Sequence, residues 1–408
     1  MLGRSTSLTV RGYSTPRPGL FAGRPRSLLA RAFARNSALR HMDWILILVV
    51  LGLTALGTLL VWSATQPSLI ATGQDPRTYL KKQLLNVVIG LVLMFAVSLA
   101  STRRLRAWTP LFCAATLLGL LAVLTPIGSQ INGAKAWISL PGGFQVEPSE
   151  FAKVALVGVT ALVFSAARQG HGSAPGLRSL LVALACAAPL IGLVVIEPAL
   201  GVAMVLVAVT ATIIVLSGIR LRIIAGLAGI VAVLVFAAGG LHLLKSYQLT
   251  RFTSFLHPSS DLAGAGYNAA QAKIAVGSGG LFGQGLFHGQ LVAGNFVPSQ
   301  QTDFIFTVAG EELGFVGTIV IVFLLGVVII RALRIATRAD DLFGLLVASG
   351  IAMWFAFQSF VNIGMTIGIM PITGLPLPFV SYGGSAIFAD MIAIGLLQSI
   401  HRRHTMFE

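Results

Sequence analysis

The sequence predicts an all-α integral membrane protein with ten transmembrane helices, because long apolar segments recur along the chain and charged residues are scarce. Only 10% of the 408 residues are charged and the mean hydropathy is +0.88, whereas a soluble globular chain is about 25% charged. A helix of about 20 apolar residues crosses the hydrocarbon core of a bilayer. Membrane-spanning strand barrels show short alternating segments instead, so helices are the expected spanning element.

Ten apolar segments follow one another after residue 43, separated by polar connections of which one is long. The two cysteines, Cys113 and Cys186, lie inside such segments and have neither disulfide nor metal-ligand spacing. The expected spans are 44–64, 83–100, 107–126, 150–167, 178–195, 199–217, 223–244, 304–330, 342–364 and 384–400.

Most of the 28 Lys and Arg residues lie before the first span, after the last span, or in every second connection between them. Connections rich in Lys and Arg stay in the cytoplasm, so both termini are predicted to be cytoplasmic. The long connection between spans 7 and 8, about 245–302, is then extracytoplasmic. The net charge of +15 follows this pattern and is not clustered on one soluble domain, so no nucleic-acid partner is expected.

Three regions are expected along the chain. Residues 1–42 form a basic, disordered cytoplasmic arm, residues 43–401 form the ten-helix domain, and residues 402–408 form a short cytoplasmic tail. The arm is rich in Arg and Ser, which is also typical of a transit peptide. Contact of a disordered arm with anionic lipid is the favoured interpretation.

Several kinds of chemistry are excluded by missing motifs. The chain has no G-x-x-x-x-G-K-[ST], no H-E-x-x-H and no Asp-x-Asp pair, which argues against an ATP-driven motor and against common metal sites. An extracytoplasmic site also has no access to cytoplasmic nucleotides. If the protein is an enzyme, the membrane itself is expected to deliver its substrate.

Two charged motifs precede span 4. In PGGFQVEPSEFAK (141–153), Glu150 and Lys153 are three residues apart and therefore share one helix face. An ionisable pair at a membrane boundary is a candidate for substrate binding, although a purely structural ion pair is an equal alternative. In NGAKAWISL (132–140), Lys135 and Trp137 are candidates for contacting a phosphate, and an interfacial tryptophan anchor is the alternative.

The long connection contains FLHPSSDLAGAGYNAAQAKIAVGSGG (255–280), a polar, glycine-rich stretch in an apolar chain. A connection of this length is usually functional. Asp261 is its only carboxylate and is the candidate catalytic base, although Ser-Ser-Asp before Gly residues is also good turn chemistry. AGYNAAQAKIAV predicts a short helix whose Gln271 and Lys273 could donate to an anionic substrate, as could Arg251. The glycines would let the backbone approach a phosphate closely.

Two further motifs follow this stretch. QTDFIFTVAGEELGFVG (301–317) opens span 8 with three acids, and PITGLPLPFVSYGGS (371–385) is a proline- and glycine-rich connection. Asp390 lies inside span 10, where a carboxylate is costly unless it is paired or faces water.

Together these motifs, in this order, resemble those of the SEDS family (shape, elongation, division and sporulation proteins, the RodA and FtsW group) over nearly the whole chain after residue 42. The short C-terminal tail and GNFVPSQQTDFIFTVAGEELG are more similar to RodA, the elongation branch. The chain departs from the family where QPDLG reads EPALG (197–201), where Ala136 replaces an Arg, and where Asp390 replaces an Asn. The departures leave the Asp261 assignment unaffected.

The resemblance implies a peptidoglycan glycosyltransferase that polymerises lipid II at the outer face of the bacterial cytoplasmic membrane. It implies that Asp261 is the essential aspartate, and that Glu150 and Lys153 are the charged pair of the family. Other implied partners are the nascent glycan, a class B penicillin-binding protein and the elongation or division machinery. No cofactor is certain and no metal ligand is assigned, although a divalent cation (Mg²⁺ or Mn²⁺) could help to stabilise the leaving pyrophosphate.

Two other functions remain alternatives. A flippase or transporter of the lipid-linked precursor would use buried charges such as Asp390 and Glu150, but transporters usually contain two related halves and the sequence shows no convincing repeat. A scaffold that only recruits cell-wall enzymes would leave the polar outer connection without a purpose. The division or sporulation paralogue of the same enzyme is the alternative within the family.

Overall fold

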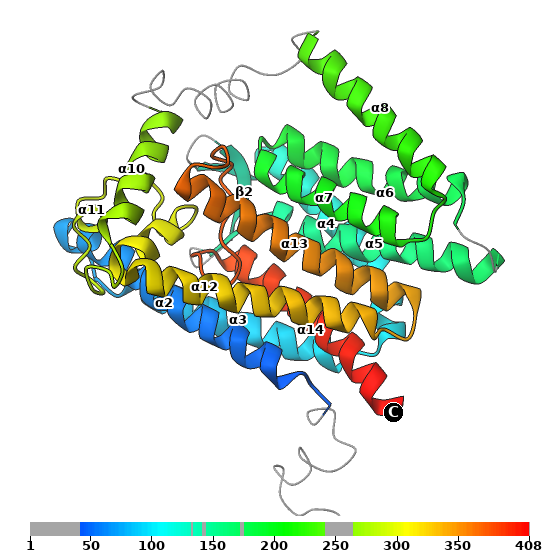
Figure 1. Ribbon diagram of the computed structural model, residues 1–408, viewed down its shortest axis with the longest axis horizontal. Helices are drawn as coiled ribbons and strands as arrows, with labels where there is room; N and C mark the ends of the chain where they lie inside the picture. The colour runs from blue at the N-terminus through cyan, green and yellow to red at the C-terminus, as the bar shows by residue number, and fades with distance from the viewer. Residues whose placement is uncertain (1–40, 132–133, 141–143, 172–174, 241–263, 408) are drawn as a thin grey trace, which may run out of the picture. The chain divides into compact units, whose positions relative to one another are not determined.

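The computed structural model describes residues 41–407 except 132–133, 141–143, 172–174 and 241–263, and the described part is a bundle of long helices with one small sheet (Figure 1). Residues 1–40 of the predicted arm (1–42) lie outside the described residues. The helices are α2 (Trp44–Ala71), α3 (Thr78–Leu99), α4 (Thr102–Leu124), α5 (Pro148–His171), α6 (Leu177–Ile196), α7 (Leu200–Leu216), α8 (Leu221–Gly240), α10 (Ala265–Ser278), α11 (Gln290–Ala293), α12 (Ile305–Thr337), α13 (Leu342–Ile367) and α14 (Gly384–Phe407).

Each of the ten predicted spans overlaps one of these helices. Eight of the described helices are long and apolar enough to cross a membrane: α2, α3, α4, α5, α6, α12, α13 and α14. Helix α7 and the part of α8 from Leu221 to Ile230 are apolar but shorter. A multi-pass membrane bundle is therefore supported, while the count of ten spans stays a prediction.

Helices α5, α13 and α14 form the buried centre of the bundle. About two thirds or more of their apolar stretches are buried, against less than a third for α3, α4 and α6. On α3, the side chains of Leu84, Val88 and Val92 recur every four residues and are all exposed, so they form one apolar face. A bundle with apolar outer faces and polar side chains at its centre is suited to lipid as a solvent.

A three-stranded antiparallel sheet lies in the connection between α4 and α5, where the sequence analysis predicted no strand. It consists of β1 (Gly128–Ile131), β2 (Ala134–Leu140) and β3 (Phe144–Val146), in the order β1-β2-β3. Strand β2 packs against both α4 and α5. The all-α expectation therefore holds for the bundle and is incomplete for this connection.

Helix α12 changes direction at Gly314, and the backbone near this kink contacts the segment that follows α10. Gly314 has φ +67° inside α12, a conformation that side chains with a Cβ rarely adopt. Backbone bonds from Phe315 N to Gly280 O (2.9 Å) and from Val316 N to Leu281 O (3.1 Å) join α12 to the segment after α10. At Gly279, a Cβ would collide with the carbonyl oxygen of Gly310. This close backbone contact docks α10 against the first turns of α12.

The end of the bundle where α2 begins carries a network of paired charges. Asp43 caps α2 by accepting from Leu46 N (3.1 Å) and pairs with Arg331 on α12 (2.6 Å). Asp341 caps α13 and pairs with Arg106 (2.9 Å) and Arg403 (2.7 Å). These contacts tie together the ends of five helices.

Candidate active site

The predicted pair of Glu150 and Lys153 is formed and fully buried at the start of α5. The Lys153 ammonium lies 2.8 Å from Glu150 Oε2 and donates to Gln358 Oε1 at 2.9 Å. It also lies 4.8 Å from the ring centroid of Trp354, within range of a cation–π interaction. Because the side chains of Lys153 and Glu150 are 0% and 2% exposed, the charges compensate each other in the low-dielectric centre of the bundle.

Gln358 on α13 organises this pair. Its Oε1 accepts from Lys153 and from Trp354 Nε1 (2.7 Å), and its Nε2 donates to Pro376 O (2.8 Å). The amide therefore links α5, α13 and the proline-rich connection before α14. Sequence reasoning did not select Gln358, although a glutamine inside an apolar span was a signal that could have found it.

Two further carboxyl groups extend this cluster: Glu147 lies near the pair, and Glu197 lies near Glu147. Glu147 accepts from Ser149 Oγ (2.8 Å), and its pKa is raised to about 8, first by burial and then by the charge of Glu150. Glu197 follows the last residue of α6 and is 1% exposed. Burial, and secondly the charge of Glu147, raise the pKa of Glu197 to about 8 as well. Both groups therefore favour the protonated form at neutral pH.

Asp390 on α14 adds a carboxyl group from the other side of the centre. Its Oδ2 accepts from Phe379 N at 3.1 Å, and it lies within electrostatic range of Lys153 and Glu150. Its Oδ1 has no hydrogen-bond partner within the described part of the chain. The sequence analysis expected a carboxylate here to be paired or to face water. In the structure, one of its two oxygens accepts a hydrogen bond from the described residues and the other does not.

The described site is therefore richer in acids than in bases. Asp303, just before α12, also acts on Glu147. Such a site suits a ligand that carries positive charge or hydrogen-bond donors. An anionic ligand could bind there only if some of the acids were protonated and therefore neutral. The acidic members are Glu147, Glu150, Glu197, Asp303 and Asp390, and Lys153 is the basic member.

Lys273 and Gln271 lie on α10, the short helix that the sequence predicted. Lys273 is exposed, and its Cε and Nζ would collide with a Cβ placed on Gly368, the C-cap residue that follows α13. The ammonium thus lies at the C-terminal end of α13, where a cation interacts favourably with the helix dipole. Gln271 is half-buried on the same helix. The described contacts do not join either residue to Lys153.

Lys135 and Trp137 lie on β2, close to the end of α4. The Lys135 ammonium donates to the carbonyl oxygen of Leu124, the last residue of α4, at 3.3 Å. Trp137 is half-buried and its carbonyl oxygen accepts from Ser129 Oγ at 3.0 Å. Lys135 therefore has a structural contact, and its role in substrate binding stays a prediction. The other two predicted site residues, Asp261 and Arg251, lie outside the described residues.

Comparison with known proteins identifies the family. Residues 43–406 match the family model of FtsW, RodA and SpoVE, which is described as "Cell cycle protein". The chain belongs to this family. The family predicted from the motifs is therefore confirmed.

Relatives of this FtsW/RodA/SpoVE chain are similar over nearly their whole length. The chain is 36% identical to "Probable peptidoglycan glycosyltransferase FtsW" of Trichlorobacter lovleyi, over 89% of this chain and 93% of that protein. It resembles the solved structure of "Rod shape determining protein RodA" of Thermus thermophilus at a TM-score of 0.63 and 30% identity, covering 89% and 97% of the two chains. A chain in the structure titled "Structural coordination of polymerization and crosslinking by a peptidoglycan synthase complex" matches at a TM-score of 0.72 and 29% identity, covering 89% and 98%.

Two adjacent glutamates in the N-terminal part of α12, Glu311 and Glu312, anchor the chain after α10. Glu311 accepts from the backbone N–H groups of Leu291 (2.7 Å) and Val292 (3.0 Å). Glu312 accepts from Ser63 Oγ on α2 (2.5 Å), and the same hydroxyl accepts from Phe287 N (3.0 Å). In this family member these acids hold the segment 284–292 in place, a structural role that the sequence analysis did not assign.

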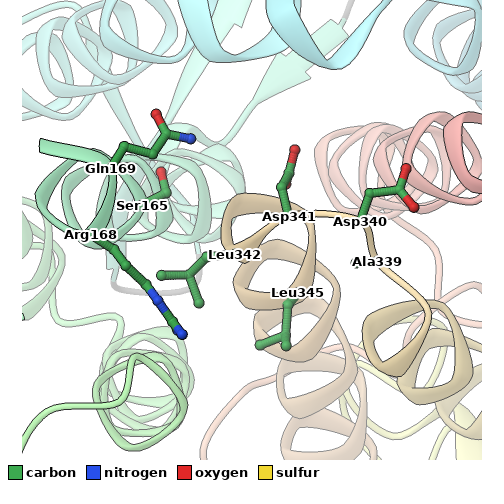
Figure 2. A pocket seen from close by; sticks show the side chains of 8 residues that line it. All are labelled: Ser165, Arg168, Gln169, Ala339, Asp340, Asp341, Leu342 and Leu345. Atoms are coloured by element: carbon green, nitrogen blue, oxygen red, sulfur yellow. The ribbon is translucent and has the colours of Figure 1, made fainter. Parts of the chain in front are cut away.

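A cavity of about 380 Å³ lies at the opposite end of α5 from Lys153. Figure 2 shows Ser165 and Arg168 of α5 on one side of it, and Asp340 and Asp341, just before α13, on the other. Fifteen residues of α5 separate Lys153 from Arg168, which is about 22 Å at 1.5 Å per residue. The cavity is therefore separate from the candidate active site, and it contains none of the predicted site residues.

Proposed function

We propose that this chain polymerises lipid II into glycan strands at the outer face of the bacterial cytoplasmic membrane during cell elongation. The enzyme class itself is that of its relatives: the chain is a peptidoglycan glycosyltransferase of the FtsW/RodA/SpoVE family, as the sequence motifs predicted. The substrate, the face of the membrane and the elongation role are the parts that we propose.

The observation that carries the proposal is the buried polar centre around Lys153. A membrane protein tolerates buried ionisable groups mainly where they bind or move something. Here a lysine and several carboxyl groups gather at the end of α5 that adjoins the sheet, in helices that belong to a glycosyltransferase family. A lipid-linked sugar pyrophosphate can reach such a site from the bilayer, with its tail between helices.

In the proposed reaction, Asp261 accepts the proton of the acceptor's GlcNAc 4-hydroxyl group. The oxygen attacks the anomeric carbon of the donor's MurNAc, and the bond to undecaprenyl pyrophosphate breaks as the new β-1,4 bond forms. One base and one displacement invert the configuration. The leaving group is already anionic, so the site has to stabilise phosphate oxygens rather than protonate an alcohol. We assign this part to Lys153, with Lys273, Lys135 and Arg251 as further candidates.

The charge pattern of the sequence supports an extracytoplasmic site. Helix α5 begins next to Glu147 and has Arg168 in its last turn, and the basic end is expected to remain in the cytoplasm. The candidate site then faces the outer leaflet, where lipid-linked precursors are polymerised.

The elongation role and the partner are supported less directly. RodA of Thermus thermophilus is among the structural neighbours, which supports the RodA branch, whereas FtsW proteins are among the sequence relatives. The neighbour described as part of a peptidoglycan synthase complex supports a class B penicillin-binding protein as the partner.

Reconstitution tests the proposal. Purified wild-type protein in liposomes containing labelled lipid II is expected to produce glycan polymer, and Asp261→Asn is expected to lower the rate by roughly 100-fold or more, the usual contribution of a general base. Asp75→Asn, an exposed carboxylate outside the site, is the matched control. Undiminished polymerisation by Asp261→Asn would contradict the assignment of the base, and movement of lipid II across the bilayer without polymer would favour a transporter.

A further inference from the structure

Glu197 is the buried carboxyl group for which neither oxygen has a hydrogen-bond partner within the described part of the chain. The other buried acids of the centre are at least half satisfied: Glu150 by Lys153 and Asp390 by Phe379 N. A native structure rarely leaves a fully buried polar group unpaired. The missing partner of Glu197 is therefore expected to be a ligand or water.

Glu197 lies next to the N-terminus of α7, which has no side-chain cap. The N-cap position of α7 is Ala199, whose side chain cannot accept a hydrogen bond. The first N–H groups of a helix have no partner within the helix, and they attract anions through the helix dipole. Glu197 itself contributes no bond to them. The carboxyl group of Glu197, which has no hydrogen-bond partner among the described residues, therefore lies only three residues before the uncapped N–H donors that begin at Leu200.

A carboxylate and a carboxylic acid would act in opposite ways here. An ionised Glu197 would repel a phosphate, whereas a neutral one donates an O–H to it. Burial and the charge of Glu147 both raise the pKa of Glu197, to about 8. The helices packed against α6 are α4, α5 and α7, and Glu147 is the titratable group that acts on Glu197 from among the described residues. Glu147 in turn is influenced by Glu150, Lys153 and Asp303.

We propose that the junction of α6 and α7 binds a phosphate oxygen of the lipid-linked substrate, with Glu197 in its neutral form as the hydrogen-bond donor and the α7 N-terminus as the second source of donors. A bound anion stabilises the proton on Glu197, and the proton stabilises the bound anion. Substrate binding is thereby coupled to the uptake of one proton. A glutamine at position 197 would be a neutral hydrogen-bond donor of nearly the same shape as the protonated Glu197.

The proposal rests on the proposed function for the identity of the substrate, so it is tested by binding without turnover. The full-length protein in detergent is titrated with fluorescent lipid II between pH 6.5 and 9.5, and undecaprenyl pyrophosphate is used as the competitor. The wild-type Kd is expected to be constant below pH 7.5 and to rise towards tenfold per pH unit above about pH 8, because one proton is linked to binding.

Two variants of Glu197 test whether its neutral or its ionised form binds the ligand. Glu197→Gln keeps a donor, so it is expected to bind within about threefold of wild type at pH 7 and to lose the pH dependence. Glu197→Ala removes the donor and is expected to weaken binding roughly tenfold or more at pH 7, the effect of losing one hydrogen bond to a charged group. Asp75→Asn is expected to retain the wild-type pH profile, and thermal unfolding verifies that each variant is folded.

Three outcomes would overturn the inference. Equal weakening in Glu197→Gln and Glu197→Ala would mean that the ionised carboxylate is needed, as for a metal ligand or a base. Wild-type binding by Glu197→Ala would mean that the residue does not contact the ligand. Failure of undecaprenyl pyrophosphate to compete would move the contact from phosphate to sugar. A wild-type protein that binds but makes no polymer would instead contradict the proposed function and leave this assignment intact.

Discussion

The two ends of the helix bundle treat charge differently. At the end where α2 begins, Asp43 and Asp341 are held by arginines and also cap helices, and the arginines are 21 to 40% exposed. At the other end, Lys153 and the acids near it are buried, and Asp390 and Glu197 keep oxygens without partners among the described residues. Paired, partly exposed charges hold the ends of helices together. Buried and incompletely paired ionisable groups lower stability, and such groups are concentrated at functional sites.

The largest expected effect comes from removing Lys153. Lys153→Met leaves Glu150 as a buried charge without its cation, and breaking a buried pair in this way costs about 3–5 kcal/mol. Thermal or denaturant unfolding of the solubilised protein should show this loss, and polymerisation should be abolished.

The double variant Glu150→Gln with Lys153→Met separates stability from function. It contains no charge of that pair, so it is expected to recover most of the lost stability and none of the polymerisation. Recovery of polymerisation in the double variant would show that the pair is structural only, which is the alternative that the sequence left open.

A smaller effect is expected at the other end. Asp43→Ala removes the cap of α2 and the partner of Arg331, which should lower the free energy of unfolding by about 1–2 kcal/mol. Polymerisation per folded molecule should remain near wild type, because Asp43 lies at the end remote from Lys153. If Asp43→Ala lost as much polymerisation as Lys153→Met, the charges at both ends of the bundle would be needed for activity, and the proposed difference between the ends would be wrong.

Some of this contrast was predictable from the sequence and some was not. The length of each apolar segment predicted the helices, and the three-residue spacing of Glu150 and Lys153 predicted their contact. Gln358 lies 205 residues from Lys153, and no local pattern indicates such a partner. The proximity of Glu197 to Glu147 likewise depends on how α5 and α6 pack. The small sheet was missed because its strands are short and lie in a connection whose length alone does not distinguish a loop from a hairpin.

The smallest effect is expected for Asp75, which is exposed between α2 and α3. Its pKa is lowered, first by the hydrogen bond from Lys81 at 2.6 Å and then by Arg77 N. A lowered pKa means that the stabilisation is present above the pKa of the unfolded chain and disappears as the pH falls through the lower pKa of the folded protein. Because both side chains are largely exposed, water and salt screen the pair. Asp75→Asn should therefore leave the melting temperature at pH 7 unchanged within error. A decrease in melting temperature as large as that of Asp43→Ala would contradict this expectation. It would show that an exposed ion pair can stabilise this fold as much as a buried one.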